Sequence, residues 1–531
     1  MEKNEATIWA ENVAQHMIES RNKKEFLCEG MWSPSGFFHI GNARAEIFTP
    51  FSVARALRDK GVKAAQNFII DDFDGIRKVP EGLVKKEKEK EFLGIPYALA
   101  PSPIKGFDSW KDAFAKEAVE TIPEFGVKLK VYSAYELYKE GKFNELIIKS
   151  LNNAEKITNV WKSIAKADKE EGFLPIQMLC TQCSRNLSTK ALSWDGKEVK
   201  FECKECNFKG KNNPLNGNAK LHWRVHWVAH WVLFNVDFES GGKDHFTKGG
   251  SVEMGHALAK EVFKINPPYQ VPTEFIQMKG KKMSGSLGNV INLREWLNVS
   301  GAEEFRYLNF SYKSQSVIDF SLDDNSFILL NENFERAKRI YYGLEDARDE
   351  KLTKKIKKEF ELSSIELEKE MPSEISYKYA VMLSQLIDEE KEFDKLERIL
   401  REAGHIPEKK LNEKEIMKIK KKIKRARYWV EKYAPEFKTE FVKKIPEEFK
   451  AVKEEVKNTI KEIGNGLDKA KNSDEIQEIV YNKGKENGLD LKELFKAIYL
   501  LLIGKSQGPK IGTLISALGK DKVKERMSKL A

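Results

Sequence analysis

The order of elements at the start of the chain constrains the fold more than any other feature of the sequence. Residues 25–31 form an apolar run, Ser33-Pro34-Ser35-Gly36 reads as a turn, and residues 42–58 have the apolar periodicity of a helix. A second apolar run, residues 63–70, follows Gly61. Two strands joined through a helix pair in parallel. The opening therefore predicts an α/β domain built on a parallel sheet.

The length predicts several domains. A chain of 531 residues exceeds the size of one hydrophobic core, so we expect two to four domains. Residues 7–19 predict an N-terminal helix, and proline and glycine interrupt the sheet pattern after residue 100, which indicates an insertion. From about Leu322 a Lys/Glu-rich helical pattern predicts an all-helical C-terminal domain. Breaks in this domain are expected near Gly404, Pro435, Pro446, Gly464 and Gly504.

Charge and hydropathy restrict the partners and the compartment. Lys+Arg number 92 against 82 Asp+Glu, and the resulting net charge of +10 would attract a polyanion such as nucleic acid. A charged surface that merely reflects the source organism is the alternative. The sequence has neither an apolar run of spanning length nor the apolar segment of a secretory signal, so a soluble, cytoplasmic protein is expected, with no membrane partner.

Four of the five cysteines form two close pairs. Cys180 and Cys183, and then Cys203 and Cys206, are C-x2-C knuckles separated by nineteen residues. This spacing predicts a zinc ribbon over residues 176–211. Four thiolates make a closed tetrahedral shell, so the Zn²⁺ would be structural. Unliganded buried cysteines or a redox pair are the alternatives.

Two further segments have the composition of a phosphate site. Pro34-Ser35-Gly36-Phe37-Phe38-His39-Ile40-Gly41-Asn42 lies where a strand turns into a helix, and backbone N–H groups there would face phosphates. Lys279-Gly280-Lys281-Lys282-Met283-Ser284-Gly285-Ser286-Leu287-Gly288-Asn289 is a loop whose ammonium groups would neutralise a leaving pyrophosphate. Taken singly, the first could be an ordinary turn and the second a basic surface loop.

Together the two segments resemble the paired HIGH and KMSKS signatures of the class I aminoacyl-tRNA synthetases. Within that superfamily the chain resembles most closely the class I lysyl-tRNA synthetases. Further stretches carry the same resemblance: Asp71-Asp72-Phe73-Asp74, Trp223-Arg224-Val225 with Trp227, Asp237-Phe238-Glu239, Gly242-Lys243-Asp244-His245 and Gly508-Pro509-Lys510-Ile511-Gly512. Two positions depart from the family pattern: Leu287 stands where a lysine is common, and His226 where Asp is usual.

The resemblance implies a fold and a set of domains. It implies a Rossmann-like parallel-sheet catalytic domain with a zinc-ribbon insertion, followed by an all-α anticodon-binding domain. The expected boundaries are an N-terminal helix at 1–24, the catalytic domain at 25–290 with its insertion at about 100–215, a stem-contact-like connector at 291–365, and the anticodon-binding domain at 366–531.

The resemblance also implies roles for individual residues. The expected catalytic residues are His39, Asn42 and Lys282. The expected ATP-binding residues are Pro34, Ser35, Gly36, His39, Gly41, Asn42, Lys282, Met283, Ser284 and Ser286. The expected amino-acid-binding residues are Ser33, Trp223, Asp244 and His245. The expected metal ligands are Cys180, Cys183, Cys203 and Cys206.

The implied activity is attachment of L-lysine to tRNA(Lys) through a lysyl-adenylate. The implied cosubstrate is ATP with Mg²⁺, and the implied structural metal is Zn²⁺. A class I synthetase for glutamate, cysteine or arginine is one alternative, and a catalytically inert tRNA-binding relative is another. His222, His226 and His230 recur every four residues beside Trp223, Trp227 and Trp231. A metal at these histidines is conceivable, but a helix packed on the sheet explains the pattern better.

Overall fold

The core of the protein is a parallel sheet, as the opening of the sequence predicts. The computed structural model describes residues 8–165, 170–283, 290–508 and 510–530. Its largest sheet has the strand order β10-β9-β1-β2-β3, with all neighbours parallel. The strands are β1 (Glu25–Trp32), β2 (Lys63–Ile70), β3 (Lys130–Ser133), β9 (Phe238–Gly242) and β10 (Tyr269–Thr273). The predicted α/β fold class is therefore confirmed.

Three helical segments connect β1 to β2 where the sequence predicts one helix. They are α2 (Ile40–Ala43), the π-helical turn η1 (Arg44–Phe48) and α3 (Thr49–Asp59). A Cβ at Gly30 of β1 would lie 2.0 Å from the backbone oxygen of Glu46, so only glycine lets η1 approach the strand this closely. The turn η1 thus places the start of the crossover helix in direct contact with the sheet.

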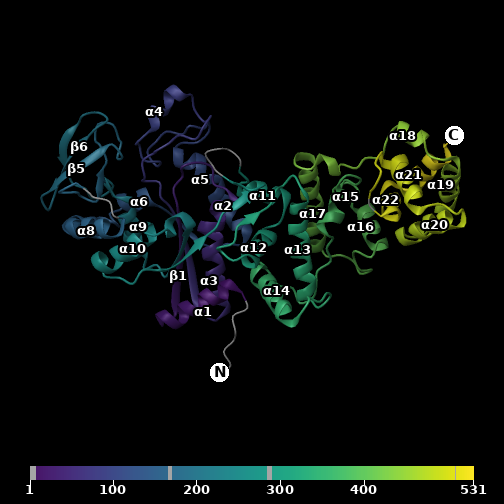
Figure 1. Ribbon diagram of the computed structural model, residues 1–531, viewed down its shortest axis with the longest axis horizontal. Helices are drawn as coiled ribbons and strands as arrows, with labels where there is room; N and C mark the ends of the chain where they lie inside the picture. The colour runs from purple at the N-terminus through teal and green to yellow at the C-terminus, as the bar shows by residue number, and fades with distance from the viewer. Residues whose placement is uncertain (1–7, 166–169, 284–289, 509, 531) are drawn as a thin grey trace. The chain divides into compact units, whose positions relative to one another are not determined.

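Helices cover both faces of the sheet (Figure 1). On one face α3 packs on β1 and β2, and α1 (Trp9–Arg21) packs on α3. On the other face α9 (Trp223–Phe234) lies against the sheet, with α10 (Ser251–Leu258) and the π-helical turn η5 (Ala259–Phe263) beside it. The apolar core on this second face includes Trp231 and Phe263. Burial on both faces explains why the strands read as apolar runs in the sequence.

The region expected as an insertion contains one strand of the main sheet. The predicted range, about 100–215, contains β3, which pairs in parallel with β2 and belongs to the main sheet. The helices of this region are α4 (Glu89–Phe92), α5 (Trp110–Thr121), α6 (Ala134–Lys139), α7 (Asn144–Asn152) and α8 (Ala154–Ala165). After them come the pair β4 (Ile176–Met178) and β8 (Ala219–Leu221), and between these the antiparallel sheet β5 (Thr189–Trp194), β6 (Val199–Cys203) and β7 (Lys209–Asn212). A four-residue strand whose first two residues are exposed gives too short an apolar signal to be recognised from sequence.

A small second sheet follows the main one. The hairpin β11 (Ile276–Met278) and β12 (Lys281–Lys282) is antiparallel, and β13 (Ile318–Asp319) pairs in parallel with β11. The remaining helices of this part are η4 (Lys243–Phe246), α11 (Leu293–Val299), α12 (Ala302–Ser311) and α14 (Glu350–Ser363). This sheet carries the first half of the lysine-rich segment.

The C-terminal part is helical, as expected. The chain separates into two compact units, and the second contains residues 298–301, 321–342 and 368–531. The segment 291–365, expected as one connector, is thus divided between the two units. The helices of the second unit are α13 (Asn325–Tyr341), α15 (Tyr377–Ser384), α16 (Phe393–Glu402), α17 (Glu413–Lys432), α18 (Glu447–Lys450), α19 (Glu454–Gly466), α20 (Ser473–Glu486), α21 (Leu491–Ile503), α22 (Ile511–Leu518) and α23 (Lys520–Ser528).

The expected helix breaks lie at or close to helix boundaries. Gly404, Pro446 and Gly504 lie at boundaries, and Gly464 lies in the last turn of α19, which ends at Gly466. A Cβ at Gly464 would come within 2.9 Å of the Cβ of Met527 on α23. Glycine at this position therefore permits the two helices to pack closely. Within the described residues, every helix is too short or too polar to cross a membrane.

Candidate active site

The motif residues gather at the carboxyl edge of the parallel sheet. Ser33 follows β1, Asp71 follows β2 and Lys243 follows β9. The backbone N–H of Asp71 donates to the oxygen of Trp32 at 2.9 Å, which ties the first two strand ends together. The direction of the chain crossovers reverses between β1 and β9. Open α/β sheets bind their ligands in the crevice at such a point.

His39 caps the helix that opens the first motif. Its Nδ1 accepts hydrogen bonds from the backbone N–H groups of Gly41 (3.1 Å) and Asn42 (3.3 Å), and the Asn42 Oδ1 accepts from the His39 N–H at 3.3 Å. Because Nδ1 is an acceptor, the neutral ring carries its proton on Nε2. Burial lowers the pKa of His39 to about 4, and the charge of Lys282 lowers it further. The imidazole is therefore a neutral donor at physiological pH.

Neighbouring side chains hold the first motif in place. A Cβ at Gly41 would lie 2.9 Å from the His39 ring, so the glycine leaves room for the imidazole. The indole N–H of Trp110, on α5, donates to the oxygen of Pro34 at 2.9 Å, and the Phe37 ring packs edge-on against Phe114 of the same helix. Pro34 and Gly36 are buried and Ser35 is exposed. The sequence reasoning missed Trp110, which lies far along the chain from the turn that it supports.

A backbone hydrogen bond joins the first motif to the segment that follows the second. The N–H of Ile40 donates to the oxygen of Ile291 at 2.9 Å, so the start of α2 contacts the segment that follows the lysine-rich motif. Lys281 and Lys282 form β12, and Met283 after them is buried. Ser284 and Ser286 lie outside the described residues. The two motifs, some 240 residues apart in sequence, therefore meet at one edge of the sheet.

The ammonium group of Lys282 faces an aromatic ring and a carboxylate. Its Nζ lies 3.4 Å from the centroid of the Phe275 ring and 3.7 Å from an oxygen of Asp244. Both charged side chains are more than half exposed, so water screens the ion pair. Lys282 can therefore exchange Asp244 for a more highly charged anion at small cost.

Three rings form an aromatic cluster next to these charges. Trp223 and Trp227, one turn apart on α9, stack with their ring centroids at 6.0 Å. The His245 ring lies 5.8 Å from Trp223 and 5.6 Å from Trp227. Burial lowers the pKa of His245, which keeps the ring neutral. Such a cluster can pack against an alkyl chain and attract a cation through the ring faces.

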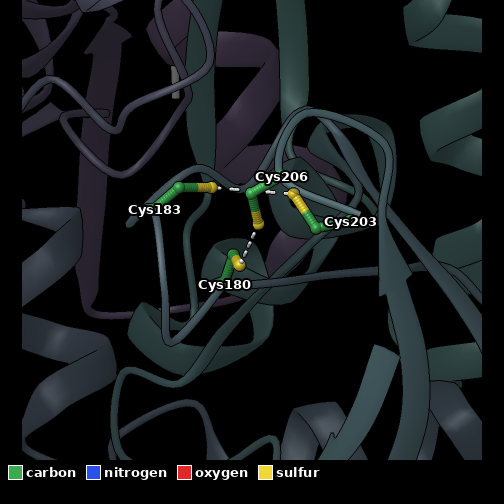
Figure 2. Close-up of side chains that lie close together, drawn as sticks. All are labelled: Cys180, Cys183, Cys203 and Cys206. Carbon is green, nitrogen blue, oxygen red and sulfur yellow. Dashed lines mark hydrogen bonds between the residues drawn. The ribbon is translucent and has the colours of Figure 1, made fainter. Parts of the chain in front are cut away.

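The four paired cysteines lie together in the ribbon formed by β5, β6 and β7. Figure 2 shows their side chains directed toward one another, and all four sulfur atoms lie within 4.8 Å of each other. The Sγ atoms of Cys180 and Cys206 are 3.5 Å apart, and those of Cys183 and Cys203 are 3.6 Å apart. A tetrahedral zinc site with Zn–S bonds of about 2.3 Å requires about 3.8 Å. The sulfur positions fit a Zn²⁺ ion.

The two knuckles have the same backbone conformation. In each, the N–H of the first cysteine donates to the oxygen five residues later, from Cys180 to Arg185 and from Cys203 to Phe208. In each, the residue after the second cysteine is left-handed, Ser184 with φ 55° and Asn207 with φ 59°. Paired turns of this kind direct two thiols each toward a common centre, which a redox pair does not require.

Comparisons with known families decide the family. A family model described as "tRNA synthetases class I (K)" matches residues 7–366, and one described as "Anticodon binding domain" matches residues 381–531. The chain belongs to the class I tRNA synthetases (K). The resemblance inferred from the two motifs is thereby confirmed.

Relatives match this synthetase along nearly its whole length. A lysine--tRNA ligase of Methanocaldococcus jannaschii is 33% identical, covering 98% of this chain and 99% of the relative. A lysine--tRNA ligase of Thermococcus kodakarensis is also 33% identical, with the same coverage. Among solved structures, a glutamate tRNA ligase from Elizabethkingia meningosepticum aligns with a TM-score of 0.44 and 12% identity over 96% of this chain and 99% of that chain.

Beneath the aromatic cluster of this synthetase lies a buried carboxylate. Glu239 of β9 accepts hydrogen bonds from the indole N–H groups of Trp227 (2.8 and 2.9 Å) and Trp231 (2.7 Å). Burial raises the pKa of Glu239 to about 7. The imidazole of His230 lies between Glu29, at 2.6 Å, and Glu239, at 3.8 Å. These three residues are close enough to hold a metal ion, but hydrogen bonds within the protein already account for their positions.

The histidine that departs from the family pattern is buried. His226 contacts the Tyr138 hydroxyl at 3.0 Å through Nδ1 and lies 3.6 Å from an oxygen of Asp71 through Nε2. Lys220, also fully buried, forms ion pairs with Asp71 (2.8 Å) and with Asp74. Burial lowers the pKa of His226, and the charge of Lys220 lowers it further. His226, on α9, thus belongs to a buried cluster with Tyr138, Asp71 and Lys220, which supports the structural interpretation of the histidine pattern.

Proposed function

We propose that this protein is a ligase that attaches L-lysine to tRNA(Lys) with ATP, through a lysyl-adenylate. The observation that carries the proposal is that the chain matches the lysine-type synthetase family while its His39 and Lys282 segments meet at one edge of the sheet. Membership of this family supports the proposed aminoacylation reaction. The contact between the two segments supports a complete ATP site.

The first step is activation. A carboxylate oxygen of lysine attacks the α-phosphorus of ATP, the bond from that phosphorus to the bridging oxygen breaks, and pyrophosphate leaves with that electron pair. Mg²⁺ bound to ATP neutralises part of the phosphate charge. The protein positions the reactants and stabilises charge, and no side chain forms a covalent bond.

We assign the ATP-binding residues from the geometry of the two motifs. The neutral Nε2–H of His39 would donate to a phosphate oxygen, with Asn42 beside it on the same helix start. Lys282 would leave Asp244 for the pyrophosphate. The other proposed ATP contacts rest on the family resemblance of the two motifs: Pro34, Ser35, Gly36, Gly41, Met283, Ser284 and Ser286.

The amino-acid site would be the aromatic cluster and its rim. Trp223 and His245 would pack against the methylenes of lysine, and Ser33, at the end of β1, would contact its polar end. Asp244 would attract the positively charged substrate once Lys282 moves to ATP. Neutral rings suit this role because a charged His245 would repel the lysine ammonium.

The second step transfers the lysyl group to the terminal adenosine of tRNA, whose hydroxyl attacks the activated carbonyl and releases AMP. The helical C-terminal part, which matches an anticodon-binding family, would read the anticodon. Zn²⁺ held by the four cysteines would fold the ribbon and take no part in the chemistry.

Charging of total tRNA with each of the twenty amino acids tests the proposal. Lysine should dominate, whereas glutamate, cysteine or arginine would identify a synthetase of another specificity. Lysine-dependent exchange of pyrophosphate into ATP, measured with tRNA present, should fall roughly 100-fold or more in Lys282→Ala. Lys281→Ala is the matched control: neighbouring residues of a strand point to opposite faces, so it should retain activity. Bound tRNA without any exchange would instead support an inert relative.

A further inference from the structure

Arg44 is a fully buried arginine two residues after Asn42. It begins the π-helical turn η1, and its side chain is 1% exposed. Its guanidinium donates to main-chain oxygens of two segments that are more than 200 residues away in sequence. Nη1 contacts the oxygens of Glu274 (3.1 Å) and Phe275 (3.4 Å), and Nη2 contacts those of Lys313 (2.9 Å), Ser314 (3.3 Å) and Ser316 (2.8 Å).

Both segments lead directly into the sheet that carries Lys282. Glu274 and Phe275 precede β11, which turns into β12. Ser314 and Ser316 precede β13, which pairs with β11. At the end of β13, Asp319 accepts the N–H of Gly280 on both carboxylate oxygens, at 3.0 and 3.2 Å, and so holds the hairpin turn next to Lys282. Arg44 therefore contacts both segments that lead into the small sheet, and Asp319 contacts the turn of its hairpin.

The carbonyl oxygens around Arg44 match the N–H donors of an arginine and not those of a lysine. Burial lowers the pKa of Arg44 to about 10, so the guanidinium stays charged at neutral pH. It presents five N–H donors in one plane, whereas lysine has three donors on a single nitrogen. A lysine at this position would keep the charge and leave some carbonyl oxygens without their donor. The sheet would then shift relative to α2 and the molecule would keep its fold.

We propose that Arg44 is a positioning residue for amino-acid activation: it fixes the hairpin that carries Lys282 relative to His39 and Asn42 across the ATP site. The inference rests on the proposed function, because it assigns Lys282 to the phosphates. Arg44 acts through Lys282 and touches no substrate.

A double-mutant cycle on the full-length protein tests this role. Arg44→Lys should lower kcat of lysine-dependent pyrophosphate exchange roughly tenfold or more, with the KM for lysine little changed. In a Lys282→Ala background the same substitution should change kcat less than about threefold, because the group that it positions is gone. In a Lys281→Ala background its effect should be the full tenfold. Equal losses in all three backgrounds would overturn the proposal and leave Arg44 a purely structural residue.

Asp319→Ala provides a second test that does not disturb the core, because Asp319 is exposed. It should lower kcat roughly threefold or more, and this loss should also vanish in the Lys282→Ala background. A loss that persists there would count against the proposal. Thermal unfolding of each variant checks that it is folded. Different results would contradict the proposed function itself: no lysine-dependent exchange by the wild-type protein, or full activity of Lys282→Ala.

Discussion

His39 combines a structural and a chemical role in one side chain. Its Nδ1 caps α2, and the same hydrogen bonds place the remaining proton on Nε2, toward which a phosphate could come. The pKa of about 4 follows mainly from burial, which disfavours the charged ring. The cap is thus secure over the pH range in which the protein would work.

This low pKa predicts a pH-dependent stability. In the unfolded chain a histidine binds its proton near pH 6.5, whereas folded His39 binds it near pH 4. The contribution of His39 to the free energy of unfolding should therefore be complete above pH 6.5 and should be lost as the pH drops toward 4. The loss from this residue is at most about 3 kcal/mol. The measurement is chemical denaturation at several pH values.

His39→Asn is the matched control for that measurement. Asparagine is a good N-cap that accepts the same backbone N–H groups and does not titrate. The variant should lose less stability than the wild-type protein between pH 6.5 and pH 4, while the other titrating groups affect both proteins alike. Parallel stability curves would show that His39 is protonated as easily in the folded protein as in the unfolded chain.

At the level of elements, the cysteine ribbon should depend on its metal. Its sheet of three short strands is too small for a core of its own, and zinc binding contributes on the order of 10 kcal/mol of folding free energy in comparable peptides. Purified protein should contain one zinc per chain, and a chelator should unfold the ribbon and expose it to protease. Cys206→Ser should behave like the chelated protein, whereas Cys28→Ser, outside the ribbon, should retain the metal. Metal-free protein with an intact ribbon would contradict the assignment.

The contact of α19 with α23 yields a prediction about packing. Gly464→Ala would place a Cβ 2.9 Å from the Cβ of Met527, an atom that cannot move without its helix. Gly484→Ala on α20 would meet only the terminal methyl groups of Leu491 and Leu494, which can rotate away. Both substitutions gain about 1 kcal/mol of helix propensity. Gly464→Ala should nevertheless be less stable than Gly484→Ala by roughly 1–3 kcal/mol in thermal or chemical unfolding. Equal stabilities would mean that the helices separate freely.

For the whole molecule, charge predicts how the substrates respond to salt. The net charge of +10 favours a polyanion, and contacts with tRNA phosphates release counterions. Raising the salt concentration from about 50 to about 200 mM should raise the KM for tRNA tenfold or more. The KM for lysine should change much less, because its proposed site offers a single carboxylate, Asp244, beside neutral aromatic rings. Similar responses of the two constants would argue against an ionic tRNA interface.

The local features of this protein can be read from its sequence. A β-α-β order, a first motif at the turn from strand to helix, and two C-x2-C knuckles are short-range patterns, and each of them is found in the structure. Local patterns are readable because the spacing of a few residues fixes their geometry. The family resemblance rested on such patterns and was confirmed for the same reason.

The tertiary structure alone decided which distant residues support the site. Arg44, Trp110 and Glu239 each form a hydrogen bond with a group that only folding brings close. The partner of a buried polar side chain cannot be read from its position in the sequence. β3 was missed because its pairing with β2, and not its own composition, makes it a strand. The packing of α19 on α23 at Gly464 was not predicted, because a glycine near a helix end and one that admits a neighbouring helix look alike until both helices are in place.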